Sequence, residues 1–226
     1  MGLIAERLAA VRAEVDAAAR ACGRDPSTVN LLAVSKTFPG AIVREAYDAG
    51  HRAFGENYAQ ELRDKATELS GLGISWHYVG RLQKNKAKYV AAAADVVHAL
   101  EDVEQAEALS ARRTTPLRVM LEVHLGGEAS KGGLAPDQVL DRCEAMARVP
   151  NILPCGLMTL PPPAEDPEAM APFFAELADL AARGRARGLA LTELSMGMSH
   201  DFPVAIRHGA TWVRVGSAIF GARTPL

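Results

Sequence analysis

The chain alternates short apolar runs with helical stretches along almost its whole length. Eight runs are typical of buried strands, and they lie at 29–35, 53–54, 75–79, 96–99, 117–123, 152–156, 191–195 and 211–215. Helical stretches fill the intervals, near 40–49, 56–69, 82–93, 101–112, 136–148, 166–187 and 200–208, and another covers the first 21 residues. Repeated strand–helix units favour a parallel sheet. We therefore expect a single (β/α)8 TIM barrel domain over residues 1–226 with an extra N-terminal helix; a doubly wound open sheet is the alternative.

Charge and cysteine content narrow the class of protein. A net charge of −2 argues against a protein that coats nucleic acid. Three cysteines, Cys22, Cys143 and Cys155, share no metal-ligand spacing and are typical of reduced thiols in the cytoplasm. No segment approaches the roughly 18 apolar residues of a membrane span. The basic run 84–88 reads by default as a solvated helix face, with weak attraction to RNA as the alternative.

Lys36 ends the apolar run 31–36, which otherwise reads as a buried strand. A buried ammonium without a partner is costly, and the usual response is a lowered pKa. The resulting neutral amine can attack a carbonyl, so Lys36 is a candidate Schiff-base lysine. The alternative is that Lys36 lies just past the strand and extends its amine into solvent.

Two loops combine glycine with hydroxyl side chains. Ser195 and Gly197 lie in the loop after the seventh predicted strand, and Gly216 and Ser217 lie after the eighth. In (β/α)8 barrels these two loops commonly bind a phosphate. The alternative is that Ser199 or Asp201 only caps the next helix.

Arg214 alternates with buried positions in the last predicted strand. A buried guanidinium needs an acceptor, which is either a structural carboxylate or a heterocyclic nitrogen of a ligand. A Schiff-base lysine, a phosphate site and a ring-facing arginine together indicate pyridoxal 5′-phosphate. His77 and His98 show no metal-ligand spacing, so we expect hydrogen-bonded barrel residues.

Several blocks of sequence then indicate a family. They read LLAVSKTFP at 31–39, FGENYAQE at 54–61, WHYVGRLQKNK at 76–86, GGEASKGGL at 126–134, GLMTLPP at 156–162 and LSMGMSHDFPVAIRHGATWVRVGSAIFGAR at 194–223. The chain closely resembles the pyridoxal phosphate homeostasis protein family, which is similar to the N-terminal domain of alanine racemase.

The resemblance implies a (β/α)8 barrel with an added N-terminal helix and assigns residues to the cofactor. Lys36 matches the lysine that holds pyridoxal phosphate as an aldimine, and Arg214 matches the residue facing the pyridine nitrogen. Asn57 matches a residue lining the pocket. The positions matching the phosphate surroundings are Ser195, Gly197, Gly216 and Ser217.

The resemblance also implies a role in intracellular pyridoxal phosphate homeostasis, without efficient catalysis, with pyridoxal-phosphate-dependent apoenzymes as partners and a monomeric state. An arginine does not readily protonate the pyridine nitrogen, so the ring is a weak electron sink. Alanine racemases draw a second base, a tyrosine, from another domain, and none of the four tyrosines here matches it by motif. An amino-acid racemase or related enzyme remains one alternative, and a barrel for another phosphorylated ligand is a second.

Overall fold

The computed structural model describes residues 2–126 and 132–222, and its strands close into a barrel. Each strand pairs in parallel with the next one along the chain, and β8 pairs with β1. The strands are β1 (Asn30–Val34), β2 (Ala53–Glu56), β3 (Ser75–Tyr78), β4 (Val96–Leu100), β5 (Leu117–Glu122), β6 (Ile152–Met158), β7 (Glu193–Met198) and β8 (Trp212–Val215). The predicted barrel is confirmed, and the open sheet is excluded by the β1–β8 pairing.

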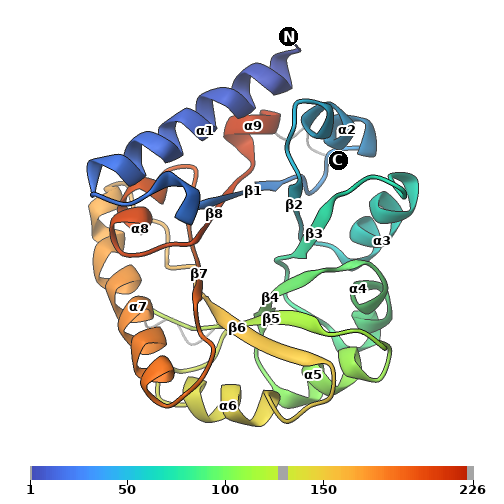
Figure 1. Cartoon of the computed structure of the whole chain (residues 1–226), viewed down its shortest axis with the longest axis vertical. Coiled ribbons are helices and arrows are strands. Elements are labelled where there is room, and N and C mark those ends of the chain that lie inside the picture. Colours follow the sequence, from blue (N-terminus) through green and yellow to red (C-terminus); the bar gives the residue numbers. More distant parts are fainter. Residues whose placement is uncertain (1, 127–131, 223–226) are drawn as a thin grey trace.

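The helices surround these strands (Figure 1). The α-helices are α1 (Leu3–Ala21), α2 (Gly40–Asp48), α3 (Ala59–Glu68), α4 (Ala87–Ala93), α5 (Val103–Ser110), α6 (Val139–Met146), α7 (Ala171–Ala186), α8 (Phe202–Arg207) and α9 (Ser217–Phe220). Short 3-10 helices are η1 (Pro26–Thr28), η2 (Lys84–Lys86) and η3 (Pro167–Met170). Among the described residues no helix is both long enough and apolar enough to cross a membrane.

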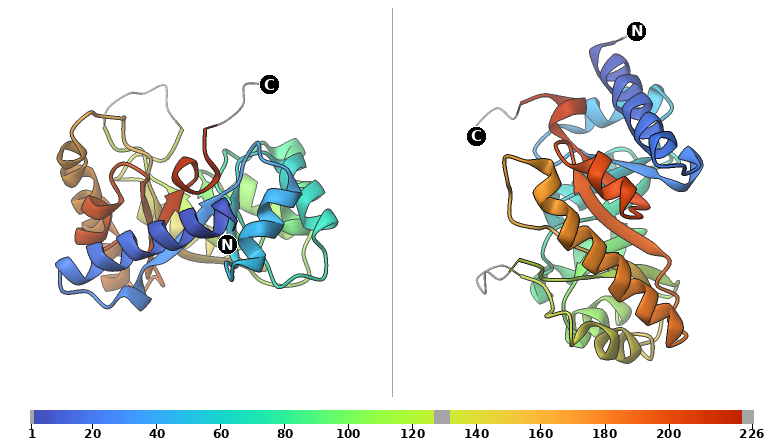
Figure 2. Two further views of the ribbon diagram at one scale, coloured as in Figure 1. Left: turned by 90° about the horizontal axis from the view of Figure 1, so that it is seen from above. Right: turned by 90° about the vertical axis from the view of Figure 1, so that its left-hand side faces the viewer.

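The extra N-terminal helix α1 packs on the outside of the barrel against α2, α8 and α9. Its buried residues recur every three or four positions, which places Ile4, Leu8, Val11, Val15 and Ala19 on one face. Gly23 then adopts a left-handed φ of 73°, and this conformation ends the helix. Figure 2 shows α1, α8 and α7 following one another along one side of the molecule.

Successive side chains of each strand point alternately to the inside and the outside of the barrel, which produces two separate apolar cores. The larger one lies between the barrel and its helices. The smaller one fills the barrel interior and consists of Leu32, Val96, Ala99, Met120, Met158 and Trp212. Buried polar side chains share that interior, because His77 and His98 contact the ring of Trp212.

The structure differs from the predicted boundaries most clearly at β7 and at the end of the chain. We expected β7 to end at Ser195, but it continues through Gly197 to Met198. The register with β8 shifts between Ser195 and Met198, and Gly197 adopts a φ of +89°, so the backbone stays paired despite a glycine typical of a loop. The four-residue helix α9 was not predicted. The GGEASKGGL block falls largely on 127–131, outside the described residues.

Candidate functional site

A cavity of about 310 Å³ lies at the carboxyl ends of the barrel strands. This end carries the active sites of (β/α)8 barrels, because the loops that follow the strands converge there. The residues lining the cavity come mainly from the loops after β1, β2, β3, β6, β7 and β8, and they are Val34, Lys36, Phe38, Asn57, Val79, Leu160, Met198, Ser199, His200, Arg214, Gly216, Ser217 and Gly221.

Five of the seven predicted site residues therefore share one cavity wall: Lys36, Asn57, Arg214, Gly216 and Ser217. The other two predicted residues, Ser195 and Gly197, are not among the lining residues and lie behind the wall.

Lys36 occupies a turn immediately after β1, which ends two residues earlier at Val34. The backbone reverses at Thr37, whose φ is 70°, and the N–H of Phe38 donates to the carbonyl of Ser35. The Thr37 N–H donates to Glu61 Oε1 at 2.6 Å, which fixes the turn to α3. Lys36 is one of the residues lining the cavity, as a lysine that reacts with a ligand there requires.

A buried ionic cluster supports this turn from behind. Lys65 of α3 donates through Nζ to Glu56 Oε1 at 2.7 Å, to Glu61 Oε1 at 2.9 Å and to the Ser35 carbonyl at 2.7 Å. The Ser35 hydroxyl also donates to Glu56 Oε1, at 2.6 Å. Burial raises the pKa of Glu56 to about 7, against the opposing effects of Lys65 and Ser35. Glu56 Oε2 is buried and has no hydrogen-bond partner among the residues that the structure describes, which agrees with that direction.

Arg214 is 5% exposed, yet it reaches the cavity from β8. Its Nη1 donates to Ser195 Oγ at 2.6 Å, and its Nη2 donates to the Thr159 carbonyl at 2.9 Å. Both acceptors are neutral, so within residues 2–126 and 132–222 Arg214 lacks the contacting carboxylate that the structural alternative required. Burial lowers the pKa of Arg214 to about 10, opposed by Asp201 and Glu122, and the side chain stays protonated at neutral pH.

The end of β7 packs closely against α8. A Cβ at Gly197 would lie 2.5 Å from Ala205 Cβ and 3.0 Å from Phe202 Cα, so glycine permits this close approach. Asp201 Oδ1 accepts from the N–H of Met198 at 2.6 Å, while no side-chain cap is formed at the start of α8. Ser199 lies in the cavity wall.

The loop after β8 leads directly into α9, and its residues Gly216 and Ser217 line the same cavity. The Gly216 carbonyl accepts from the N–H groups of Ile219 and Phe220, at 3.0 and 2.9 Å. A Cβ on Gly216 would approach the Val34 carbonyl oxygen to 3.0 Å, so this position joins β8 closely to β1.

Sequence reasoning did not identify Phe38, Leu160, Met198 or His200 as lining residues. All four lie within blocks that carried the family resemblance, so their position in those blocks was the available signal. A larger groove of about 800 Å³ lies between α1 and α2. None of the predicted site residues lines it, and it lies away from the strand ends that carry Lys36 and Arg214. We therefore take the smaller cavity as the candidate site.

Comparison with known proteins agrees with this architecture. The family model of the alanine racemase N-terminal domain matches residues 7–224. A pyridoxal phosphate homeostasis protein from Pseudomonas aeruginosa is 47% identical over 226 residues, covering 99% of this chain and 97% of that protein. One from Aquifex aeolicus is 40% identical over 222 residues, covering 96% of this chain and 97% of that protein.

Solved structures give the same result. PipY from Synechococcus elongatus with pyridoxal phosphate bound has a TM-score of 0.83 and 36% identity, covering 96% of this chain and all of that chain (100%). Alanine racemase from Corynebacterium glutamicum has a TM-score of 0.70 at 19% identity, covering 97% of this chain and 61% of that one, and so shares the fold.

Proposed function

Because this chain belongs to the alanine racemase N-terminal domain family, together with the curated pyridoxal phosphate homeostasis proteins, we propose that it binds pyridoxal 5′-phosphate and takes part in the intracellular homeostasis of that cofactor. The observation that carries the proposal is that Lys36 and Arg214 line one cavity at the carboxyl ends of the barrel strands. The structure of PipY, a relative with the same fold, has been solved with the cofactor bound.

The side chains around the cavity suit this ligand. Pyridoxal phosphate supplies an aldehyde that condenses with amines, an electron-withdrawing pyridine ring and a phosphate. Lys36 supplies an amine, and the buried guanidinium of Arg214 supplies donors suited to a ring nitrogen. Gly216 and Ser217 offer a close backbone approach and a hydroxyl for the phosphate, and Asn57 completes the wall.

We assign Ser195 and Gly197 a supporting place in the same site. Ser195 is fully buried and accepts a hydrogen bond from Arg214, so it acts on the ligand through the arginine. Gly197 holds the end of β7 against α8 and thereby positions Met198, Ser199 and His200 at the wall.

We propose that the protein holds the cofactor rather than using it for efficient catalysis. Arg214 keeps its protons at neutral pH, so it would donate a hydrogen bond to the ring nitrogen of the cofactor without transferring a proton. Within the described part of the chain, none of the four tyrosines lies among the residues lining the cavity. Racemisation by two bases needs an acid or base on each face of the substrate, and these residues supply no tyrosine for that purpose.

The wider role follows from holding a reactive aldehyde. We propose that the chain, as one domain and as a monomer in the cytoplasm, limits the free cofactor and delivers it to apoenzymes that depend on it. The unpaired thiols Cys22, Cys143 and Cys155 support a reducing compartment.

Delivery is tested by mixing the loaded protein with an apoenzyme. The rate of activation of the apoenzyme is compared with the rate obtained with free cofactor. A rate no different from that of cofactor released into solution would contradict direct transfer.

The first experiment adds pyridoxal phosphate to the purified protein, records the visible spectrum, reduces with borohydride and maps the modified lysine. We expect a band at longer wavelength than that of the free aldehyde, with the label on Lys36. Lys36→Ala should abolish the band, while Lys88→Ala, at an exposed lysine, should leave it unchanged. A label on another lysine in the wild-type protein would overturn the assignment.

The alternative of an amino-acid racemase or related enzyme is tested with the same loaded protein. Amino acids are incubated with it in deuterium oxide, and exchange of the α-proton is followed by NMR. Exchange of the α-proton at a rate typical of enzymes would contradict the proposed carrier role and show that the protein is a catalyst.

A further inference from the structure

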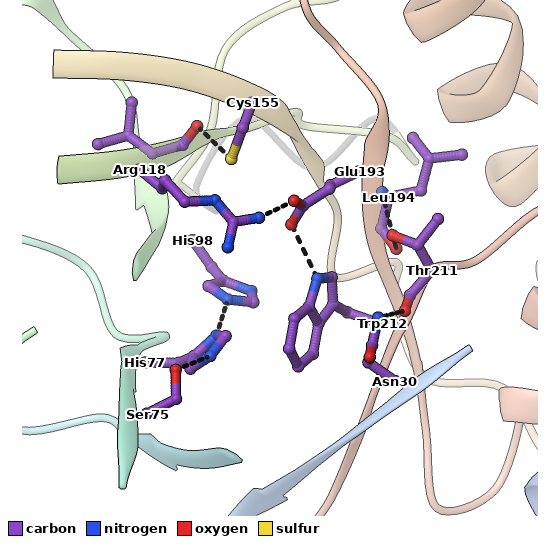
Figure 3. Close-up of polar contacts among 11 residues, drawn as sticks. Asn30, Ser75, His77, His98, Arg118, Cys155, Glu193, Leu194, Thr211 and Trp212 are labelled. Carbon is purple, nitrogen blue, oxygen red and sulfur yellow. Dashed lines mark hydrogen bonds and ion pairs between the residues drawn. The ribbon is translucent and has the colours of Figure 1, made fainter. Parts of the chain in front are cut away.

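A continuous series of hydrogen bonds runs through the barrel interior from Arg214 to Ser75. Arg214 Nη1 lies 2.6 Å from Ser195 Oγ, which lies 2.8 Å from His98 Nδ1. His98 Nε2 lies 2.8 Å from His77 Nδ1, and His77 Nε2 lies 3.1 Å from Ser75 Oγ. Figure 3 shows the part from Ser75 to His98. The series joins the cavity to the opposite end of the barrel, where Ser75 begins β3.

The arginine determines the direction of these hydrogen bonds. A guanidinium only donates, so Ser195 Oγ accepts from Arg214. Ser195 is fully buried, and its hydroxyl proton therefore needs an acceptor. His98 Nδ1 is the other polar atom within hydrogen-bond distance of this oxygen among the described residues. Ser195 thus donates to His98 Nδ1, which must be unprotonated.

The same reasoning then determines which nitrogen carries the proton in each of the two imidazoles. A neutral imidazole with an unprotonated Nδ1 carries its proton on Nε2, so His98 donates to His77 Nδ1. His77 is then also protonated on Nε2 and donates to Ser75 Oγ. Reversing every bond would leave the buried Ser195 hydroxyl proton without an acceptor, which is unfavourable because a buried donor then goes unsatisfied.

The surroundings keep both rings neutral. Burial, with a smaller contribution from Arg118, lowers the pKa of His77 to about 3, and burial lowers the pKa of His98 well below 6.5. The Trp212 ring lies beside them, with its centroid 4.6 Å from that of His77. Trp212 Nε1 in turn donates to Glu193 Oε2 at 2.8 Å, and Glu193 also pairs with Arg118 (Figure 3). The pair of histidines is thus enclosed at the end of the barrel opposite the cavity.

We propose that Ser195, His98 and His77 are positioning residues for Arg214, and that they form a one-way hydrogen-bond chain in which both histidines are neutral and protonated on Nε2. These hydrogen bonds hold the guanidinium at the cavity wall, and no carboxylate of the described residues contacts it to neutralise its positive charge. The tautomers follow from the protein alone, whereas the effect on a ligand rests on the proposed function.

The tautomers are tested on protein labelled with ¹⁵N, by long-range ¹H–¹⁵N correlation without added ligand. The signals of the two rings are assigned from His77→Gln and His98→Gln. We expect a protonated Nε2 and an unprotonated Nδ1 in both rings, unchanged from pH 5.5 to pH 8. A protonated Nδ1 in either ring, or titration within this range, would overturn the proposed chain.

The effect on the site is tested with Ser195→Ala, with the exposed Ser70→Ala as the matched control. Losing a hydrogen bond to a charged group should weaken pyridoxal phosphate binding by about tenfold. It should also shift the visible band and disturb the ¹⁵N signals of His98. Wild-type affinity and spectrum in Ser195→Ala would refute the positioning role.

The two proposals fail separately. If borohydride labelling of the wild-type protein leaves Lys36 unmodified, the proposed function fails, while the tautomers measured without ligand still decide the hydrogen-bond chain. If Ser195→Ala does not fold, the ¹⁵N measurement of the histidine tautomers in the wild-type protein still decides whether the hydrogen-bond chain exists.

Discussion

The ammonium of Lys65 lies 2.7 Å from the carboxylate of Glu56, and both side chains are buried directly behind the turn that carries Lys36. This pair joins β2 to α3, and through the Ser35 carbonyl it also holds the end of β1. The protonation of Glu56 therefore affects both the stability of the folded protein and the position of Lys36.

Glu56 should make the free energy of unfolding depend on pH. Its pKa is raised by burial from 4.5 to about 7, so between these values the folded protein keeps a proton that the unfolded chain has lost. This contribution is fully present below pH 4.5 and is lost as the pH rises through 7. We expect the stability of the wild type relative to Glu56→Gln to fall from pH 5 to pH 7, by at most about 1.4 kcal/mol per pH unit.

Urea denaturation of both proteins at several pH values measures this difference. His77 has a lowered pKa and acts in the opposite direction, losing stability as the pH falls below 6.5, so the wild-type curve alone mixes the two effects. The exposed Glu14→Gln is the control. A wild-type minus Glu56→Gln difference that is constant with pH would contradict the raised pKa.

Lys65→Met should be strongly destabilising at pH 8 and less so at pH 5. Removing one partner leaves the buried carboxylate of Glu56 unpaired, which costs about 3–5 kcal/mol when it is ionised. At pH 5 the carboxyl group can hold its proton and needs the ammonium less. The same denaturation measurement gives both values, with Lys88→Met at an exposed position for comparison. Equal costs at the two pH values would count against the pairing.

Arg214→Met should impair ligand binding more than stability. A buried guanidinium carries a desolvation cost, and because its two acceptors are neutral, its removal leaves no unpaired charge in the interior. Binding loses the donors facing the cavity, so we expect the affinity for pyridoxal phosphate to fall by about tenfold or more. Titration followed by visible absorbance and urea denaturation measure the two effects, and Arg112→Met serves as the exposed control. Unchanged affinity with a large loss of stability would assign Arg214 a purely structural role.

Gly197→Ala should cost more stability than Gly23→Ala, although both glycines have positive φ values of 89° and 73°. A left-handed conformation alone costs an alanine about 1–2 kcal/mol. A Cβ at Gly23 meets nothing within 4 Å, whereas one at Gly197 would press on Ala205 and Phe202, adding about 1–3 kcal/mol. Denaturation of the two variants isolates the packing effect. Equal losses would show that α8 can move away from β7.

The sequence predicted the barrel well, because eight apolar runs alternate with helical stretches along the chain. It also indicated the end of the barrel that carries the cavity, because most of those runs are followed by polar or glycine residues. It did not predict that β7 continues past Ser195, because a paired strand and a loop share the same residues when a glycine adopts positive φ. The histidines were predicted as hydrogen-bonded barrel residues, and they bond to each other. That His98 also contacts Ser195 could not be read from the sequence, since it depends on which strands face each other across the barrel.

The pairing of β1 with β8 has a consequence for the order of events during synthesis. Leu32 of β1 is in register with Arg214 of β8, so the two walls that carry Lys36 and Arg214 meet at the closure of the barrel. A growing chain that has left the ribosome as far as β7 already displays the lysine but lacks the arginine and the loop opening at Gly216. The pocket is thus completed only when β8 and the loop after it have been made, and a nascent chain cannot capture its ligand at full strength before those residues emerge.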